Sequence, residues 1–278
     1  MREHRSDEAI VLLRKAIALD PSDSWTYEGL SQALIFNGKP VEGRAFLDMA
    51  LRVDPGWSEW RYYQAGLAAF GDGRYEEAVA ALGKIDPASS NPWPKFYGLH
   101  VKVAALAHLG RTAEASEALD GLSAVFQERQ EGQPNLLTAQ RYFIYKRPED
   151  MARLLGGLRK AGVPDLPVGL AAANAQRLTG SEIVALVFGH ELKGRRRLPE
   201  TASYHAMIAA DGAITKTIGG AVFTGHAWVQ GDHLCTAYPR VLASCGALFR
   251  NPDGTPEAMN EFTMLFPLNS RYEFSVAK

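Results

Sequence analysis

The chain has 278 residues, 46% of them hydrophobic and 22% charged, which is typical of a globular protein with one large domain or two ordinary ones. Its formal net charge of −1 excludes a bulk electrostatic attraction to nucleic acid or to an anionic membrane, so we expect neither as a partner. The sequence contains no run of about 18 apolar residues, so no membrane-spanning helix is predicted. The N-terminus lacks the apolar core of a secretory signal. We therefore expect a cytoplasmic protein.

The first expected helix, residues 6–19, ends in Asp20-Pro21, and a segment of the same pattern ends in Asp54-Pro55. The two prolines are 34 residues apart (55 − 21), and both follow a helix with small, large and small apolar residues. This period and pattern are the sequence signature of the tetratricopeptide repeat. Each such repeat is a helical hairpin that cannot bury its apolar face alone, so neighbouring repeats are expected to stack into a solenoid.

Residues 6–19 match the second helix of a hairpin, so the chain is expected to begin in the middle of a repeat. This predicts an apolar face near the N-terminus that needs a cover, either from another domain of a longer protein or from a second copy of the chain. A homodimer through the exposed first helix is therefore one expectation.

Three repeats and two end-cap helices follow in the helical part. In the first complete repeat, Asn37-Gly38 predicts a helix end in the left-handed conformation. Pro148 predicts a helix start, where its missing N–H costs nothing. The domain expected from residues 1–165 is thus an all-helical solenoid, with repeats at 24–55, 59–87 and 96–126, end-cap helices within about 135–162, and a linker at 166–176.

Residues 177–278 have a different character. Thr179 and Glu182 form a capping box that begins a short helix ending near Phe188. Short alternating runs separated by turn pairs follow, and Asp211-Gly212 between two of them is a strong hairpin signal. The expected fold class is α+β multidomain, with the solenoid followed by a small antiparallel β domain, either a sheet, a sandwich or a partial barrel. Its expected strands are 203–208, 213–218, 226–229, 234–238, 247–250, 261–266 and 272–276.

The helical segments Ala18-Leu-Asp-Pro21, Ala33-Leu-Ile-Phe36, Gly73-Arg-Tyr-Glu-Glu-Ala78 and 147–162 resemble the C-terminal tetratricopeptide region of bacterial class III adenylate/guanylate cyclase-like proteins. Residues 177–183, 231–235 and 249–255 are similar to a β-rich appendage that sometimes follows such repeats. The family's catalytic domain has no counterpart in these residues. The resemblance implies a regulatory or docking segment of bacterial signalling proteins.

The first candidate site is the concave groove of the solenoid, where aromatic side chains on the first helix of each hairpin suit a bound peptide or helix. The alternative is that several of these residues pack between repeats. Together with Phe70 and Ala104, the positions expected to face the groove are Trp25, Glu28, Gln32, Trp60, Tyr63, Leu67, Tyr97 and His100.

The two cysteines, Cys235 and Cys245, admit a cross-strand disulfide, plain free thiols or, with His226 and His233, a metal site. Close Cys pairs of the kind that bind zinc are absent, so we expect no metal.

Motifs of catalysis and of cofactor binding are also absent, and acids such as Asp211 and Asp232 lie in turn pairs. We expect no catalytic residue, no cofactor and no enzyme activity. The basic cluster Lys193-Gly-Arg-Arg-Arg197 is expected in a solvated loop, with a phosphate or an acidic partner as the alternative.

The sequence thus predicts a non-enzymatic scaffold or regulatory module that binds a protein or peptide in the concave face of the solenoid. The alternative is a regulatory fragment of a cyclase-like signalling protein whose β domain binds a small ligand. Trp228, Tyr238 and Phe249 are candidates to line that ligand pocket, or else to fill the core of the domain.

Overall fold

The computed structural model describes residues 3–56, 58–167, 169, 171, 175–239, 241–267 and 270–277. It divides into two compact units. The helical unit comprises Met1–Arg129 and Tyr142–Val163, and the barrel unit comprises Gln130–Arg141 and Pro164–Lys278. The barrel unit thus includes residues 130–141, part of the segment expected to cap the repeats.

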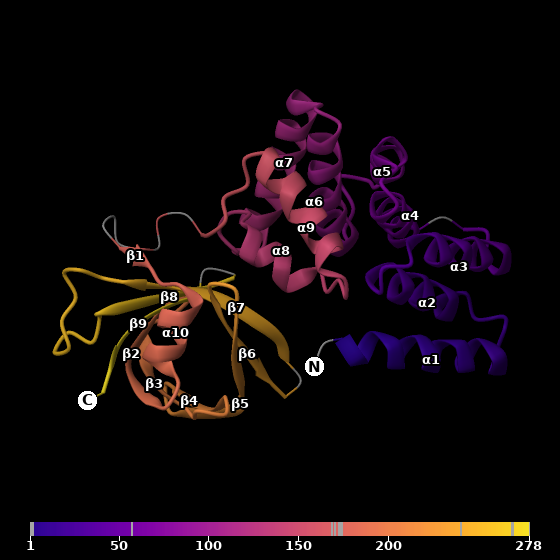
Figure 1. The fold of residues 1–278 in the computed structure, drawn as a ribbon. Helices are drawn as coiled ribbons and strands as arrows, with labels where there is room; N and C mark the ends of the chain where they lie inside the picture. Colours follow the sequence, from indigo (N-terminus) through magenta and orange to yellow (C-terminus); the bar gives the residue numbers. More distant parts are fainter. Residues whose placement is uncertain are drawn as a thin grey trace. The chain divides into compact units, whose positions relative to one another are not determined.

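The helical unit consists of successive helical hairpins. Helix α1 packs on α2, and the pairs α2–α3, α4–α5 and α6–α7 form the hairpins at the three predicted repeats. The first helix of each hairpin packs on the first helix of the next. Figure 1 shows α1 stacked on the hairpin α2–α3. Its described helices are α1 (Glu3–Leu19), α2 (Ser24–Phe36), α3 (Pro40–Val53), α4 (Glu59–Gly71), α5 (Tyr75–Leu82), α6 (Pro92–His108), α7 (Thr112–Glu128) and α9 (Pro148–Lys160).

The first helix of each hairpin ends in the same way. The backbone becomes left-handed at Gly38, Gly73 and Gly110, with φ of 79°, 78° and 71°. Glycine adopts this conformation without the steric penalty of a Cβ atom, and it turns the chain into the second helix. The predicted helix end at Asn37-Gly38 is therefore confirmed, and the same device recurs in the two later hairpins.

Small and large residues alternate where the helices of a hairpin meet. Leu47 and Ala50 of α3 are fully buried, as their repeat pattern predicts. A Cβ atom at Gly43 would lie 2.6 Å from the Ile35 side chain and 2.8 Å from the Ser31 carbonyl oxygen, so α2 and α3 approach closely there. On α1, in contrast, the side chains of Val11, Leu12 and Leu19 are exposed.

In the barrel unit, a closed antiparallel barrel forms from eight strands of the described residues. Each strand pairs with the next in the sequence, and the last pairs with the first, which is an up-and-down topology. The short strand β1 (Gln176–Arg177) extends the ring by pairing with one end of β7. The barrel strands are β2 (His190–Leu198), β3 (Ala202–Ile208), β4 (Ala213–Ile218), β5 (Ala221–Gln230), β6 (His233–Tyr238), β7 (Val241–Arg250), β8 (Phe262–Phe266) and β9 (Ser270–Val276).

The closed barrel corrects two sequence predictions. The expected sheet, sandwich or partial barrel is a complete ring, because β2 pairs with both β3 and β9. The basic cluster 193–197 lies in β2 and is not a loop. Its strand pattern is hidden because basic residues occupy both faces: Lys193 and Arg195 face outward, while Arg196 shares the inner face with Leu192.

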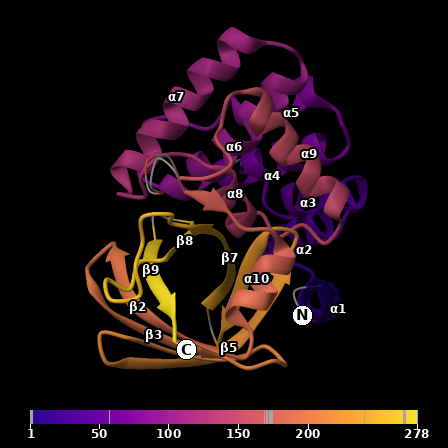
Figure 2. The ribbon, with the colours of Figure 1, turned by 60° about the vertical axis from the view of Figure 1, so that its left-hand side comes forward.

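One end of the barrel is closed by helix α10 (Gly180–Val187), which Figures 1 and 2 show beside the ring of strands. The predicted capping box is confirmed: the Thr179 hydroxyl accepts from the Glu182 backbone N–H, and the Glu182 carboxylate accepts from the Thr179 backbone N–H. Ile183 and Val187 are fully buried and pack into the barrel core with Leu192 and Phe274. This end of the barrel is therefore apolar and filled.

The remaining part of the barrel unit lies before α10. Helix α8 (Leu136–Tyr142) begins after Asn135, whose side chain accepts from the Thr138 backbone N–H. Part of the expected linker, 166–176, lies outside the described residues. Within the described part, Leu166 and Ala171 pack on the outer face of the barrel against Phe249. No helix among the described residues is long and apolar enough to cross a membrane.

Candidate functional site

A tryptophan occupies the second position of the first helix in each hairpin. Trp25 lies in α2, Trp60 in α4 and Trp93 in α6, with spacings of 35 (60 − 25) and 33 (93 − 60). The preceding cap fixes where each helix begins. Asp23 accepts from the Trp25 backbone N–H at 3.0 Å and Asn91 from that of Trp93 at 3.2 Å, while Ser58 caps α4 through the Arg61 backbone N–H.

The three tryptophans, which we call the tryptophan row, are open to solvent to different degrees. Trp25 is 72% exposed and Trp93 is 39% exposed, whereas Trp60 is half-buried. The Tyr97 ring links the last two, with its centroid 6.1 Å from that of Trp60 and 6.0 Å from that of Trp93. The Arg129 guanidinium lies 4.2 Å from the Trp93 ring centroid, a cation–π distance.

Trp25 and Trp60 are among the positions predicted to face the groove, whereas Trp93 is not. The signal that identifies Trp93 is its place in the repeat: each tryptophan stands two residues after a capping Asp, Ser or Asn. Large aromatic side chains at equivalent places in the three repeats, two of them exposed and one half-buried, form the best-defined candidate interaction surface of the helical unit.

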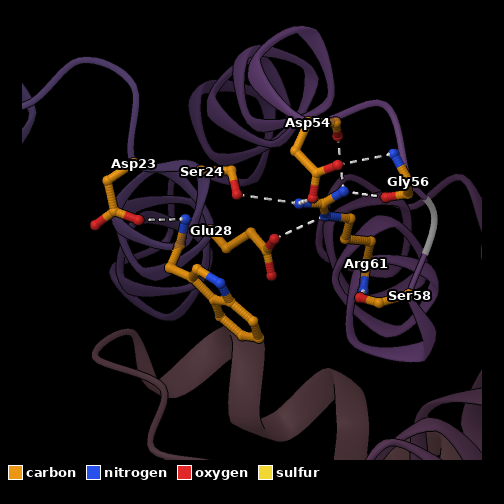
Figure 3. A network of polar contacts seen from close by, with 8 residues as sticks. Asp23, Ser24, Glu28, Asp54, Gly56, Ser58 and Arg61 are labelled. Carbon is orange, nitrogen blue, oxygen red and sulfur yellow. Dashed lines mark hydrogen bonds and ion pairs between the residues drawn. The ribbon is translucent and has the colours of Figure 1, made fainter.

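Glu28, expected in the groove, instead forms a buried ion pair. Its carboxylate accepts a hydrogen bond from Arg61 Nε at 2.7 Å, and both side chains are almost fully buried (Figure 3). The Arg61 Nη2 group donates to the Asp54 carboxylate at 2.9 Å and to the Ser24 hydroxyl at 3.3 Å, and Nη1 donates to the carbonyl oxygens of Asp54 and Gly56.

This network joins two hairpins, because Glu28 lies on α2 and Arg61 on α4. The Asp54 carboxylate also accepts from the Gly56 backbone N–H at 3.2 Å. That hydrogen bond, and then the one from Arg61, lower the pKa of Asp54. Glu28 is thus held by its own chain, and its contribution is to align the repeats.

Five other groove positions are fully or almost fully buried: Tyr63, Leu67, Phe70, His100 and Ala104. His100 Nδ1 lies 2.8 Å from the Phe96 carbonyl oxygen, which can only accept, so Nδ1 carries the proton. Burial lowers the pKa of His100 to about 4, and the bond to Phe96 offsets only part of that effect. His100 is therefore a neutral core histidine at ordinary pH.

A segment of the chain itself covers these buried positions. In residues 142–146, which precede α9, the Phe143 ring lies 5.7 Å from Tyr97 and 5.6 Å from His100. The Lys146 backbone N–H donates to the Phe36 carbonyl oxygen at 2.8 Å, at the end of α2. Burial, together with the neighbouring Tyr145 and Tyr97, raises the pKa of Tyr63 well above its usual value.

Helix α9 continues along the same helices. Arg153 Nη1 donates to the Gly71 carbonyl oxygen at 2.6 Å, at the end of α4, and His108 Nε2 lies 2.9 Å from the Arg153 carbonyl oxygen. We call residues 142–158 the inner segment. Because it occupies one part of the expected groove, the residues of the predicted set that keep solvent exposure are Trp25, Gln32, Trp60 and Tyr97. That these residues bind a partner stays a prediction.

In the barrel unit, Cys235 of β6 and Cys245 of β7 lie directly opposite each other and form a disulfide. His233 Nε2 lies 3.1 Å from Arg177 Nη2, and burial followed by the charge of Arg177 lowers the pKa of His233. Among the described residues, no group of three or more His, Cys, Asp and Glu side chains is placed to hold a metal ion.

The three residues considered for a ligand pocket in the β domain lie in different places. Tyr238 is on the inner face of the barrel, where it lines a small cavity. Trp228, whose ring stacks on His226 with centroids 6.3 Å apart, is opposite Cys235 on the outer face. Phe249 also faces outward and is covered by the segment before α10. The barrel therefore brings only Tyr238 of the three to its interior.

Comparison with known families agrees with the repeat pattern. Residues 1–67 match the family described as tetratricopeptide repeat, so the N-terminal helices have the sequence features of that repeat. The match covers α1, the hairpin α2–α3 and most of α4. No curated protein matches the chain significantly in sequence.

Proposed function

We propose that the helical unit is a non-enzymatic docking module that binds a protein or peptide at the tryptophan row. The match of residues 1–67 to the tetratricopeptide repeat supports this proposal, because such repeats commonly mediate protein interactions. The observation that carries it is the recurrence of a tryptophan at the same place in the three hairpins, exposed at Trp25 and Trp93 and half-buried at Trp60. A capped helix start would repeat for structural reasons alone, whereas a solvent-exposed tryptophan has no such reason.

The chemistry of the surface favours a partner segment with apolar side chains. Tryptophan contributes large contact area with only two rotatable side-chain bonds to fix, so it is common among residues that dominate binding energy. An extended or helical segment with apolar side chains fits this surface.

The experiment compares three single variants of the full chain as bait in a lysate of the host. Trp25→Ala and Trp93→Ala remove exposed rings, and Val41→Ala removes an exposed apolar side chain from α3 as the matched control. A partner retained by the wild type and by Val41→Ala, but lost with either tryptophan variant, supports the proposal. Equal retention by all four proteins contradicts it. Unchanged melting temperatures of the variants exclude unfolding as the cause.

A narrower proposal is that this chain serves as a regulatory segment of a cyclase-like signalling protein. It is supported only by the resemblance of the repeat segments and of the β-rich part, and the family match concerns the repeats. Co-purification of a nucleotide cyclase with the full chain would support it. Absence of any cyclase among the retained partners would contradict it.

Homodimerisation through α1 is a further proposal, supported by its exposed Val11, Leu12 and Leu19. Light scattering tests it: equal masses for the wild type and for a Val11→Glu, Leu12→Glu variant would contradict it. The disulfide between Cys235 and Cys245 weighs against the expected cytoplasmic location, because disulfides persist mainly in oxidising compartments.

A further inference from the structure

The two ends of the barrel interior differ in polarity. Near α10 the inward-facing side chains are apolar, whereas near the turns β2–β3, β4–β5 and β6–β7 they include two cations and three tyrosines. We call this second end the polar mouth. A cavity of about 10 Å³ separates it from the packed core, which is close to the space that one water molecule needs. The cavity is lined by Tyr204, Ile208, Ile214, Lys216, Leu234, Thr236, Tyr238, Met264, Phe266 and Tyr272.

Lys216 is the first cation of the polar mouth. It lies on β4 on the inner face, directly between Ala206 of β3 and Phe223 of β5. Its Nζ atom is 4.1 Å from the centroid of the Tyr238 ring and 5.6 Å from that of Phe223. The ammonium group is therefore held against aromatic faces inside the barrel, and it does not extend freely into solvent as a surface lysine does.

Arg196 is the second cation. It lies on β2 opposite Tyr272 of β9, and its Nε donates to the Glu200 carbonyl oxygen at 3.2 Å. Tyr272, the strand neighbour of Arg196, lines the same small cavity as Lys216. Burial, and then the charge of Arg196, lower the pKa of Lys216, and the same charge offsets part of the rise that burial causes in the pKa of Tyr272.

Neither cation has a carboxylate partner among the described residues. The ion pairs of this region, Lys193 with Glu191 and Arg197 with Glu273, lie on the outer face of the barrel. Two like charges that face a protein interior without an anion are unfavourable for folding. Residues that oppose stability in this way are often retained for binding.

The tyrosines of the polar mouth are neutral hydrogen-bonding groups. Burial raises the pKa of Tyr204, of Tyr238 and of Tyr272 above the usual value, so their hydroxyls keep their protons. The Tyr238 and Ser244 hydroxyl oxygens are buried and have no hydrogen bond of normal geometry within the described residues, although Thr236 acts on the pKa of Tyr238. Donors that can turn toward a ligand thus stand beside the two cations.

We propose that the polar mouth of the barrel binds a small organic oxyanion, with its carboxylate or phosphate between Lys216 and Arg196 and a ring-sized apolar body against Tyr204, Tyr238 and Tyr272. The arginine guanidinium offers paired N–H donors that match the two oxygens of such a group, and the lysine adds a point charge. The tyrosine faces suit a flat apolar body. Because the core below is filled, the ligand is short and its body stays at the mouth.

The site also predicts how binding depends on pH. Burial, and then the charge of Arg196, lower the pKa of Lys216 to about 8. The groups that face it from the neighbouring strands are Arg196 of β2, Tyr204 of β3, Phe223 of β5, Tyr238 of β6 and Tyr272 of β9. Burial raises the pKa of the three tyrosines, so they stay uncharged between pH 7 and 9. An anion bound by the protonated lysine therefore loses affinity as the pH rises through about 8.

The test is calorimetric titration of the full chain at pH 7 with 2-naphthoate, 2-naphthyl phosphate and the neutral 2-naphthamide. The full-chain variants Lys216→Met and Arg196→Met remove one charge each from the polar mouth. The matched control Lys193→Met removes a charge from the outer face of β2, the strand that carries Arg196. We expect an anion to bind the wild type and the control equally, and to bind each of the other variants and the wild type at pH 9 about tenfold or more weakly. We expect the amide to bind as weakly.

The two anions distinguish the source of the oxyanion: preference for the phosphate ester assigns the site to phosphates, and preference for naphthoate assigns it to carboxylates. Failure of both anions to bind at millimolar concentrations would overturn the proposal. So would binding that survives in both variants, or amide binding as tight as that of the anion. Lys216→Met removes a poorly solvated charge and is expected to melt higher than the wild type; should it not fold, Arg196→Met and the pH series decide the question.

Discussion

Gly157 of α9 lies against Ala104 of α6 with no space for a side chain between the two helices. A Cβ atom at Gly157 would lie 2.7 Å from the Ala104 Cβ atom and 2.7 Å from the Ala104 carbonyl oxygen. A Cβ atom at the neighbouring Gly156 would meet no neighbouring atom within 4 Å. One glycine therefore sets the distance between α9 and α6, and the other has no such role.

These two glycines give a matched pair of variants for the docking of the inner segment. Gly157→Ala should lower the free energy of unfolding by about 1–3 kcal/mol, because the added methyl group overpacks a helix contact that includes backbone. Gly156→Ala should raise it by roughly 0.5–1 kcal/mol, because alanine is the better helix former. Urea unfolding measures both changes, and equal effects of the two substitutions would show that α9 does not dock on α6 in solution.

The buried pair of Glu28 and Arg61 gives the second prediction. Removing one partner leaves the other charge buried, so Glu28→Ala and Arg61→Met should each destabilise the chain by about 3–5 kcal/mol. The double variant should lose less than the sum of the two single losses, since no buried charge is then left unpaired.

The exposed pair of Arg44 and Asp48, at 3.0 Å, is the control. Asp48→Ala should cost less than about 1 kcal/mol, because solvent screens an exposed pair. A double-mutant cycle measured by urea unfolding compares the two pairs. Additive effects at Glu28 and Arg61 would contradict the coupling that their geometry implies.

The sequence predicted the repeat part well because its signals are local. The capping residues, the glycines that end the first helices and the period of 34 all lie within one or two hairpins. The sequence could not predict that Phe143 would lie against α6 and Lys146 against α2. These contacts join residues about 40 to 110 positions apart, and no local pattern marks them. They separate the buried positions of the expected groove from the exposed ones.

In the barrel, the sequence predicted most strands but missed β2. Strand prediction relies on apolar residues at alternate positions, and the inner face of β2 carries Leu192, Gly194 and Arg196 in turn. The same substitution of charge for an apolar side chain occurs at Lys216 of β4. Arg196 and Lys216 belong to the polar mouth, so the alternation of apolar residues is interrupted where the proposed ligand site meets the core, although β4 was still predicted.

The disulfide between Cys235 and Cys245 gives the third prediction. It closes a loop of sequence separation 10, which in the chain-entropy description is worth about 3 kcal/mol at 25 °C. Reduction should therefore lower the melting temperature of the barrel unit within the full chain. A Cys235→Ala, Cys245→Ala variant should melt at one temperature with or without reductant. Two titratable thiols in the unreduced, denatured protein would show that the bond does not form.

The buried imidazole of His100 gives the fourth prediction, a loss of stability in mild acid. An unfolded histidine has a pKa of about 6.5, whereas burial lowers the pKa of His100 to about 4. Between these values the unfolded chain binds more protons, so stability is full above about pH 6.5 and falls as the pH drops toward 4. The whole loss is about 3 kcal/mol for a shift of this size.

His100→Phe tests this prediction, because the ring is already surrounded by Phe96, Phe126 and Phe143. The difference in unfolding free energy between the wild type and the variant should change with pH between 4 and 6.5 and stay constant above that range. Carboxylates with lowered pKa values, such as Asp54, lose their contribution to stability at lower pH. They do so in the wild type and in the variant alike, so the difference between the two proteins cancels this effect. A constant difference across pH 4–6.5 would mean that His100 is protonated in the folded chain, and hence that water or a partner charge reaches its ring.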